Sequence, residues 1–218
     1  MDIMEAIDLR HSVRQYLDKP IDEDLVNNLK KEIEECNKES GLHIQLVLNE
    51  PKAFDTFMAH YGKFQGVTSY IALIGKKDSD LEEKCGYYGE RLVLKAQQLG
   101  LNSCWVALTY KKIPSAFTIK SGEKLVAVIA IGYGKTQGTP NKSKSIEQVS
   151  NISSSTPSWF IEGVKTALKA PTALNQQKFK IIFEDGKVIF KEGMGFYTKI
   201  DLGIVKFHFE IGSKIKNV

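Results

Sequence analysis

The sequence has few cysteines, and their spacing matches neither a disulfide framework nor a metal site. Cys36, Cys85 and Cys104 are odd in number and far apart, and they form no Cys-x-x-Cys or Cys/His cluster. A disulfide-rich fold and a structural zinc site are therefore excluded as classes. This cysteine usage is typical of a reducing compartment, so we expect a cytoplasmic protein without a metal centre.

Long apolar runs and catalytic signature motifs are also missing. No stretch approaches the roughly 18 apolar residues of a membrane span, and acidic residues precede any apolar run at the N-terminus, so we expect neither an anchor nor a secretory signal. The sequence has no Walker loop, GxGxxG or HExxH motif, and no nucleophile at motif spacing from a base. A hydrolase or a metalloenzyme should show its nucleophile or its ligands, so neither class is favoured.

Charge is distributed unevenly along the chain. From Lys135 to the C-terminus there are 13 Lys and 7 acidic residues, whereas the preceding part has a small acidic excess. The lysines are scattered, and no dense basic run with interleaved aromatics appears, so a solvated surface is favoured over a nucleic-acid interface. We expect a small anionic ligand, and a nucleic-acid-associated protein remains an alternative.

Hydrophobic periodicity predicts alternating helices and strands along the whole chain. Strands are expected near 43–49, 69–75, 103–108, 124–133 and 178–191, the last as a hairpin around Asp185-Gly186. Longer helices are expected near 3–9, 23–40, 79–99, 158–168 and 198–212.

The predicted helix near 79–99 contains two glycines, Gly86 and Gly89. Each glycine costs about 1 kcal/mol relative to alanine in a helix interior, so some contact should offset the loss. Close approach of a second backbone is the simplest candidate. We therefore expect this helix to pack on a partner subunit, which would make the protein a homodimer.

The segment Arg10-His11-Ser12-Val13-Arg14-Gln15-Tyr16 places two guanidinium groups and one hydroxyl at alternating positions. If the backbone is extended there, Arg10, Ser12 and Arg14 point to the same side. Arginine pairs its planar fork with two phosphate oxygens, and a serine hydroxyl can complete the shell. The spacing therefore indicates a phosphate site, although arginines flanking a serine also occur in solvated surface turns.

Three segments together resemble the FMN-dependent nitroreductase family. The first is the Arg-x-Ser-x-Arg-x-aromatic pattern at 10–16, followed by Lys19-Pro20-Ile21-Asp22, and the second is Leu-Gly-Leu-x-Ser-Cys-Trp at 99–105. The third, Ala-Pro-Thr-x-x-Asn-x-Gln at 170–177, is similar to the family's second flavin-contacting motif. Family members carry that motif after the second helix, where this chain has residues 36–40 and lacks it. Such a displacement resembles the divergent TM-type branch of the family.

The resemblance implies an α+β, nitroreductase-like three-layer fold with a mostly antiparallel central sheet flanked by helices. All the predicted strands, including 178–191, are expected in that sheet. We expect a single domain over residues 1–218, within which the displaced motif suggests two related halves at about 1–150 and 151–218.

The resemblance also implies an oxidoreductase that binds FMN and transfers electrons from NAD(P)H to a nitroaromatic, quinone or similar acceptor by a ping-pong mechanism. The flavin carries the chemistry in such enzymes, so no catalytic side chain is expected. The implied cofactor-binding residues are Arg10, Ser12, Lys142 and Lys144 for the phosphate and ribityl chain, Arg14 for the ring near N1 and O2, and Thr172, Asn175 and Gln177 for the ring edge.

Structural alternatives accompany several of these assignments. Lys142 and Lys144 are also typical of a lysine-rich surface, and Pro171 and Asn175 also fit a helix end followed by a turn. His208, between two phenylalanines, is more typical of a partly buried core histidine with one hydrogen bond than of a catalytic base. A flavin-binding module without turnover is the main functional alternative, because the second motif is displaced.

Overall fold

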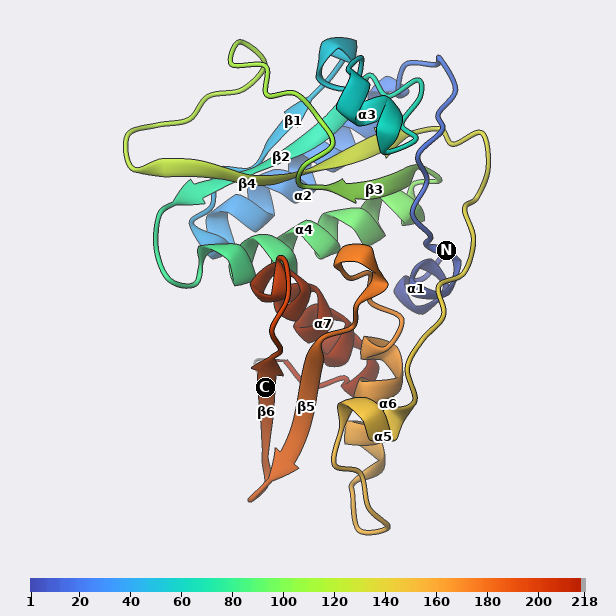
Figure 1. The fold of residues 1–218 in the computed structure, drawn as a ribbon, viewed down its shortest axis with the longest axis vertical. Coiled ribbons are helices and arrows are strands. Elements are labelled where there is room, and N and C mark those ends of the chain that lie inside the picture. Colours follow the sequence, from blue (N-terminus) through green and yellow to red (C-terminus); the bar gives the residue numbers. More distant parts are fainter. Residues whose placement is uncertain (217–218) are drawn as a thin grey trace. The chain divides into compact units, whose positions relative to one another are not determined.

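The computed structural model describes residues 1–216, and the chain folds into two compact units (Figure 1). Unit 1 consists of Met1–Leu81 and Leu92–Pro140, and unit 2 consists of Glu82–Arg91 together with the chain from Asn141 onwards. The helix α4 (Leu81–Gln98) contributes residues to both units. No helix among residues 1–216 combines the length and the hydrophobicity needed to cross a bilayer.

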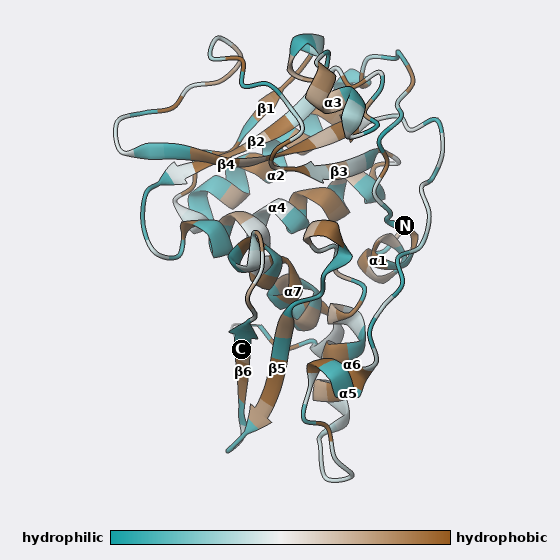
Figure 2. Cartoon of the chain, viewed as in Figure 1, coloured by the Kyte–Doolittle hydropathy of each residue, from teal (hydrophilic) through white to brown (hydrophobic). Residues whose placement is uncertain are grey.

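Unit 1 is built on a four-stranded antiparallel sheet, in the order β1-β2-β4-β3. Its strands are β1 (Gln45–Val47), β2 (Ser69–Lys76), β3 (Asn102–Val106) and β4 (Glu123–Gly132). The apolar run of β2 is buried at all but its last residue, as expected for a central strand that is covered on both faces. Figure 2 shows hydrophobic residues along the strands of this sheet.

Helices cover both faces of the sheet, with α2 (Glu23–Ser40) on one face and α3 (Phe57–Tyr61) on the other (Figure 1). The helix α1 (Ile3–Leu9) begins with a capping box between Asp2 and Glu5, and the 3-10 helix η1 (Pro51–Ala53) precedes α3. Gly41 ends α2 with a left-handed φ of 72°. The antiparallel α+β arrangement predicted from the family resemblance is confirmed.

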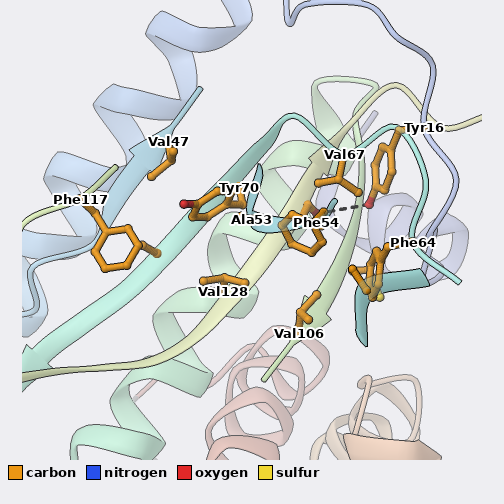
Figure 3. Packing of buried hydrophobic residues seen from close by; sticks show 14 of the residues in the cluster. Tyr16, Val47, Ala53, Phe54, Phe64, Val67, Tyr70, Val106, Phe117 and Val128 are labelled. Atoms are coloured by element: carbon orange, nitrogen blue, oxygen red, sulfur yellow. Dashed lines mark hydrogen bonds between the residues drawn. The ribbon is translucent and has the colours of Figure 1, made fainter. Parts of the chain in front are cut away.

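The core of unit 1 between the sheet and α3 is rich in aromatic residues (Figure 3). Phe54 packs on Phe64 and Tyr70, with ring centroids 5.3 and 5.9 Å apart. Tyr16 is also buried there, and its hydroxyl donates to the carbonyl of Val13 at 2.7 Å. Tyr16 therefore anchors the segment 10–16 in the core, because the ring fills it and the hydroxyl is satisfied.

Unit 2 pairs short helices with a two-stranded sheet. Its elements are α5 (Ile146–Val149), α6 (Ser158–Ala167), the 3-10 helix η2 (Ala173–Asn175), β5 (Phe179–Glu184), β6 (Lys187–Glu192) and α7 (Thr198–Ser213). The hairpin at Asp185-Gly186 is confirmed, and both turn residues have positive φ, 51° and 74°.

The prediction that the 178–191 hairpin belongs to the central sheet is wrong. β5 and β6 form a separate two-stranded sheet, and an isolated bridge joins Ile181 of β5 to Ser150. Their aromatic residues pack on helices instead, since the rings of Phe183 and Phe190 lie 5.2 and 5.3 Å from Phe160 of α6 and Phe209 of α7. An Asp-Gly turn determines how two strands pair, but the contacts around a hairpin determine which sheet it joins.

The helical glycine Gly86 is covered within the chain. Together with residues 82–91 of α4, α7 forms a close crossing in unit 2, where a Cβ at Gly86 would overlap the carbonyl of Ile200. The contact is reciprocal, because a Cβ at Gly203 of α7 would overlap the carbonyl of Glu83. Glycine allows this backbone approach. The expected close approach of a second backbone is therefore present, but α7 supplies it, so the argument that led from Gly86 to a partner subunit no longer holds.

Candidate functional site

The segment 10–16 is extended in the structure, which is the condition under which side chains at alternating positions point to the same side. Backbone hydrogen bonds attach it to its neighbours in unit 1: the N–H of Val13 donates to Ser103 at 3.0 Å, and that of Tyr16 donates to Gln65 at 2.9 Å. Ser12 pairs with Ser103 in an isolated bridge beside β3. The side chains at alternating positions are therefore held by a backbone that is fixed at several points.

The segment 10–16 lies beside Cys104, a buried residue of β3. Burial raises the pKa of the Cys104 thiol, while the charges of Arg14 and Arg10 and a hydrogen bond with Ser12 lower it in part. Arg10 is buried, Ser12 is half-buried and Arg14 is exposed. The extended backbone is compatible with the predicted alternation, and the binding of a phosphate by these two cations and this hydroxyl stays a prediction.

The segment after β4 is also held against this region, by a side chain that the sequence analysis did not single out. Asn102 Oδ1 accepts the N–H of Gly134 at 3.0 Å, and its Nδ2 donates to Gln137 Oε1 at 2.9 Å. Gly138, at a φ of 74°, lies so close to His11 that a Cβ there would come within 2.8 Å of the His11 Cβ. Asn102 lies within the family-like 99–105 segment, but its role depends on partners more than 30 residues away.

The remaining predicted cofactor-binding residues lie close together in unit 2. Gln177 is buried, and its Nε2 donates to the carbonyl of Lys142 at 2.8 Å while its Oε1 accepts the N–H of Lys144 at 2.8 Å. Asn175 Nδ2 donates to the same Lys142 carbonyl at 2.9 Å. Thr172 Oγ1 accepts the N–H of Gln177 at 3.0 Å. The structure therefore joins the predicted basic segment and the predicted ring-contacting loop into one hydrogen-bonded group.

The loop from 172 to 177 has an unusual backbone. Leu174, Asn175 and Gln177 have left-handed φ values of 51°, 53° and 46°, and none of them is a glycine. Such conformations cost on the order of 1 kcal/mol each for a residue with a Cβ. They persist only where surrounding contacts determine them, and strained backbone of this kind is concentrated at ligand sites.

Two further residues of the loop network were missed by the sequence analysis, namely Asp201 and Gln176. Asp201, in the first turn of α7, accepts the N–H of Ala173 at 2.9 Å and Gln176 Nε2 at 2.8 Å. Burial raises the pKa of Asp201 to about 6, and the hydrogen bonds from Gln176 and Ala173 oppose that rise. An aspartate near a helix start is common as a capping residue, so its spacing alone does not reveal this role.

His208 is a buried packing residue, as its position between phenylalanines predicts. Its side chain is fully buried in unit 2, with Nε2 at 2.9 Å from Glu90 Oε1 and Nδ1 at 3.3 Å from the carbonyl of Thr166. It has two hydrogen bonds, where the sequence analysis expected one. These contacts join α4, α6 and α7 and leave neither ring nitrogen for proton transfer to a ligand.

The predicted site residues thus form two groups, one in each unit. Arg10, Ser12 and Arg14 lie in unit 1, and the loop residues lie in unit 2 with Lys142 and Lys144. Among residues 1–216, no group of three or more His, Cys, Asp or Glu side chains is placed to hold a metal ion.

Comparison with solved structures identifies the fold. A protein described as a putative nitroreductase from Thermotoga maritima has a TM-score of 0.70 at 24% identity, and the match covers 97% of this chain and 83% of that one. A protein so described from Desulfovibrio desulfuricans, crystallised with FMN, has a TM-score of 0.55 at 16% identity and matches 72% of this chain and 99% of its own. A protein from Parabacteroides distasonis, described as a putative NADH dehydrogenase/NAD(P)H nitroreductase, has a TM-score of 0.53 at 21% identity, with 67% and 95% covered.

Sequence comparison with curated proteins finds no match. The family model described as "Putative TM nitroreductase" matches residues 2–213, which is nearly the whole chain. The match includes both groups of predicted site residues. The extended arginine segment, the antiparallel sheet and this match agree, and the chain belongs to the TM-type nitroreductase family, an oxidoreductase family with the nitroreductase fold.

Proposed function

We propose that this oxidoreductase binds FMN and transfers electrons from NAD(P)H to a nitroaromatic, quinone or similar small acceptor by a ping-pong mechanism. The observation that carries the proposal is the extended, anchored backbone of the segment with Arg10, Ser12 and Arg14, in a chain of this family. FMN, when bound, supplies the chemistry by accepting hydride from NAD(P)H and passing electrons to the acceptor. The side chains of the protein bind and orient it.

The phosphate is assigned to Arg10 and Ser12, with Lys142 or Lys144 as the further cation. Two oxygens of a phosphate match the paired donors of a guanidinium, and the serine hydroxyl donates to the third. Arg14 is assigned to the ring near N1 and O2, where a positive charge stabilises negative charge on a reduced flavin. Its exposed side chain is available for that contact.

The ring edge is assigned to the loop from 172 to 177. The amides of Asn175 and Gln177 both donate to the Lys142 carbonyl, but Asn175 is exposed whereas Gln177 is buried. We therefore assign the direct contact to Asn175, and we assign Gln177 and Thr172 to holding the loop in the shape that presents Asn175. The Desulfovibrio desulfuricans protein crystallised with FMN supports a flavin as the ligand of this fold.

The absorbance spectrum of the purified protein tests the cofactor. Absorbance bands near 370 nm and about 450 nm are expected for bound FMN, and denaturation should release the flavin that gives them. Steady-state oxidation of NADH and of NADPH, with menadione or nitrofurazone as acceptor, then tests turnover. Flavin bands without turnover would mean a flavin-binding module, and DNA retention without flavin bands would favour a nucleic-acid-associated protein.

Assembly and location complete the proposal. The family resemblance implies a homodimer, and this stays a prediction without the support of Gly86, since α7 already covers that glycine. Light scattering at micromolar protein concentration measures the oligomeric state. The cysteine usage supports a cytoplasmic location, because none of the three cysteines forms a disulfide among the described residues.

A further inference from the structure

The buried carboxylate of Asp201 is placed to control the strained loop. Its two oxygens accept two different donors, the N–H of Ala173 at 2.9 Å and Gln176 Nε2 at 2.8 Å. The same Gln176 nitrogen also donates to the carbonyl of Phe196 at 2.7 Å. Asp201 thus attaches the loop at Ala173 and at Gln176, on either side of the left-handed residues Leu174 and Asn175.

The hydrogen bonds to Asp201, rather than an ion pair, accompany its burial among the described residues. Only 3% of Asp201 is exposed, and no ion pair joins it to a cation in the part of the chain that the structure describes. Burying a charge without an ion pair is unfavourable unless hydrogen bonds compensate for lost water. An uncharged asparagine would avoid that penalty, but it offers one oxygen and would turn its NH2 group toward one of the two donors. The site therefore requires a carboxylate with both oxygens accepting.

Two parts of the chain each contain a helix, a pair of strands and a closing helix, namely α2, β1, β2 and α4, and α6, β5, β6 and α7. The loop and the carboxylate occur together only in the second. In α7 Asp201 stands two residues before the helical glycine Gly203, whereas Lys84 stands two residues before Gly86 in α4. In the first part, the connection between α2 and β1 runs from Gly41 to Ile44, and the only residue in it with a left-handed φ is the glycine. This pairing is expected if Asp201 serves the loop rather than the helix.

We propose that Asp201 is a positioning residue for the cofactor: in its ionised form it holds residues 173–176 in the strained conformation that presents Asn175, and protonation releases the loop and weakens cofactor binding. This inference rests on the proposed FMN site. Asp201 itself is not assigned a contact with the ligand. It acts through Gln176 and the backbone of Ala173.

The proposal predicts a pH dependence whose sign follows from the two loop hydrogen bonds, because they oppose the rise in the pKa of Asp201 and therefore favour its ionised form. The pKa of Asp201 is raised to about 6, so the group is ionised at pH 7.5 and protonated at pH 5. The donors that face it from the loop are uncharged, and on the adjoining part of α4 Glu83 pairs with Lys206 instead. Lys199 is the neighbouring charge on α7. Affinity should therefore fall as the pH falls through about 6.

The test measures FMN affinity and loop protection in the full chain with Asp201→Asn and Gln176→Leu. Each variant removes one side of the contact, and Gln176→Leu leaves α7 unchanged if Asp201→Asn fails to fold. Glu192→Gln is the matched control, because it neutralises an exposed carboxylate that accepts from Thr198 at the same end of α7. Hydrogen exchange of the amides of residues 173–177, without FMN, reports the loop itself.

We expect Asp201→Asn and Gln176→Leu to weaken FMN binding about ten-fold at pH 7.5 and to lower amide protection in the loop, with no change for Glu192→Gln. The FMN phosphate also titrates near pH 6, so the informative quantity is the additional acid-dependent loss of affinity in the wild type relative to Asp201→Asn. Equal affinity and equal pH profiles in both would overturn the proposal. A wild type that binds no FMN would instead overturn the proposed function, and the cofactor role of Asp201 with it.

Discussion

A helix, two strands and a closing helix occur twice in this chain, first as α2, β1, β2 and α4, with η1 and α3 between the two strands, and then as α6, β5, β6 and α7, with η2 before β5. Both strand pairs are antiparallel, and the sixth residue of each closing helix is a glycine. The outcomes differ, because the first pair is extended by β4 and β3 into a four-stranded sheet while the second stays two-stranded. A two-stranded sheet is marginal in water, so the second copy depends on its helices for stability.

The proposed ligand contacts also come from two regions, one before the first copy and one within the second. Before the first copy lies the extended segment 10–16, whose backbone is fixed and whose charged side chains supply the chemistry. Within the second copy lies the loop from 172 to 177, whose polar side chains mostly bond one another and hold a strained backbone. Substitutions in the first region should therefore change binding more than stability, and substitutions in the second should change both.

The largest effect is expected where the α4–α7 crossing is not symmetric. Glu90 of α4 and His208 of α7 are fully buried and hydrogen-bonded to each other. At the corresponding positions relative to the two crossing glycines, α7 has Phe207 and α4 has Arg91, which cannot form the same pair. We expect His208→Ala to lower the free energy of unfolding by about 3 to 5 kcal/mol, because it leaves a cavity and a buried carboxyl group without this partner. Urea denaturation measures it.

The control for that experiment is His43→Ala in unit 1. His43 contacts Glu123 at 2.9 Å, but its side chain is 25% exposed, so a loss of less than about 1 kcal/mol is expected. A similar loss in the free energy of unfolding for the two variants would show that the buried Glu90–His208 contact stabilises the protein no more than the partly exposed His43–Glu123 contact does.

The next effect concerns the symmetric centre of the same crossing. We expect Gly86→Ala and Gly203→Ala to destabilise the protein by similar amounts, about 2 to 3 kcal/mol each, because each added methyl meets a backbone carbonyl of the other helix. This exceeds the gain of about 1 kcal/mol in helix propensity. Thermal or urea unfolding measures both, with exposed Lys165→Ala as the neutral reference. A stabilised Gly203→Ala variant would contradict the reciprocal packing.

In the first region, Arg10→Ala should weaken FMN binding more than Arg14→Ala does. Loss of one charge-assisted phosphate contact costs roughly 1.5 to 3 kcal/mol, or about 10-fold to 100-fold in affinity. Fluorescence titration with FMN measures this, and Lys77→Ala, an exposed lysine of the same unit, serves as control. The reverse order would mean that Arg14, rather than Arg10, holds the phosphate.

The smallest effect is expected for Asn175→Ala in the loop. The substitution should cost about 1 kcal/mol of stability, because alanine tolerates a φ of 53° less well than asparagine and the bond to the Lys142 carbonyl is lost. If Asn175 also contacts the ring, the flavin reduction potential or FMN affinity should shift. Asn151→Ala is the matched control, since Asn151 bonds the backbone of Phe183 in the same unit. Unchanged affinity and potential in Asn175→Ala would remove the ring contact.

Much of the fold could be predicted from local sequence patterns. The apolar run from Tyr70 to Ile74 indicated a buried strand, Asp185-Gly186 indicated the hairpin turn, and Gly41 indicated the end of α2; all three are observed. The alternation of Arg10, Ser12 and Arg14 indicated an extended segment, and its backbone is extended beside β3. Each of these inferences depends on residues that are near one another in the sequence.

The remaining features depend on partners that are distant in the sequence. Alternation in 178–191 determines that the hairpin forms, but not that it packs on α6 and α7 instead of joining the central sheet. The glycine at 86 indicates a close backbone approach, yet only the fold shows that the other backbone belongs to the same chain. Asp201 carries no local pattern for holding a loop about 25 residues earlier, because its role arises from a buried position and two converging donors. By itself the sequence determined the elements and the charged segment, and the tertiary structure decided which surfaces cover them, because burial and hydrogen bonding between distant residues exist only in the folded chain.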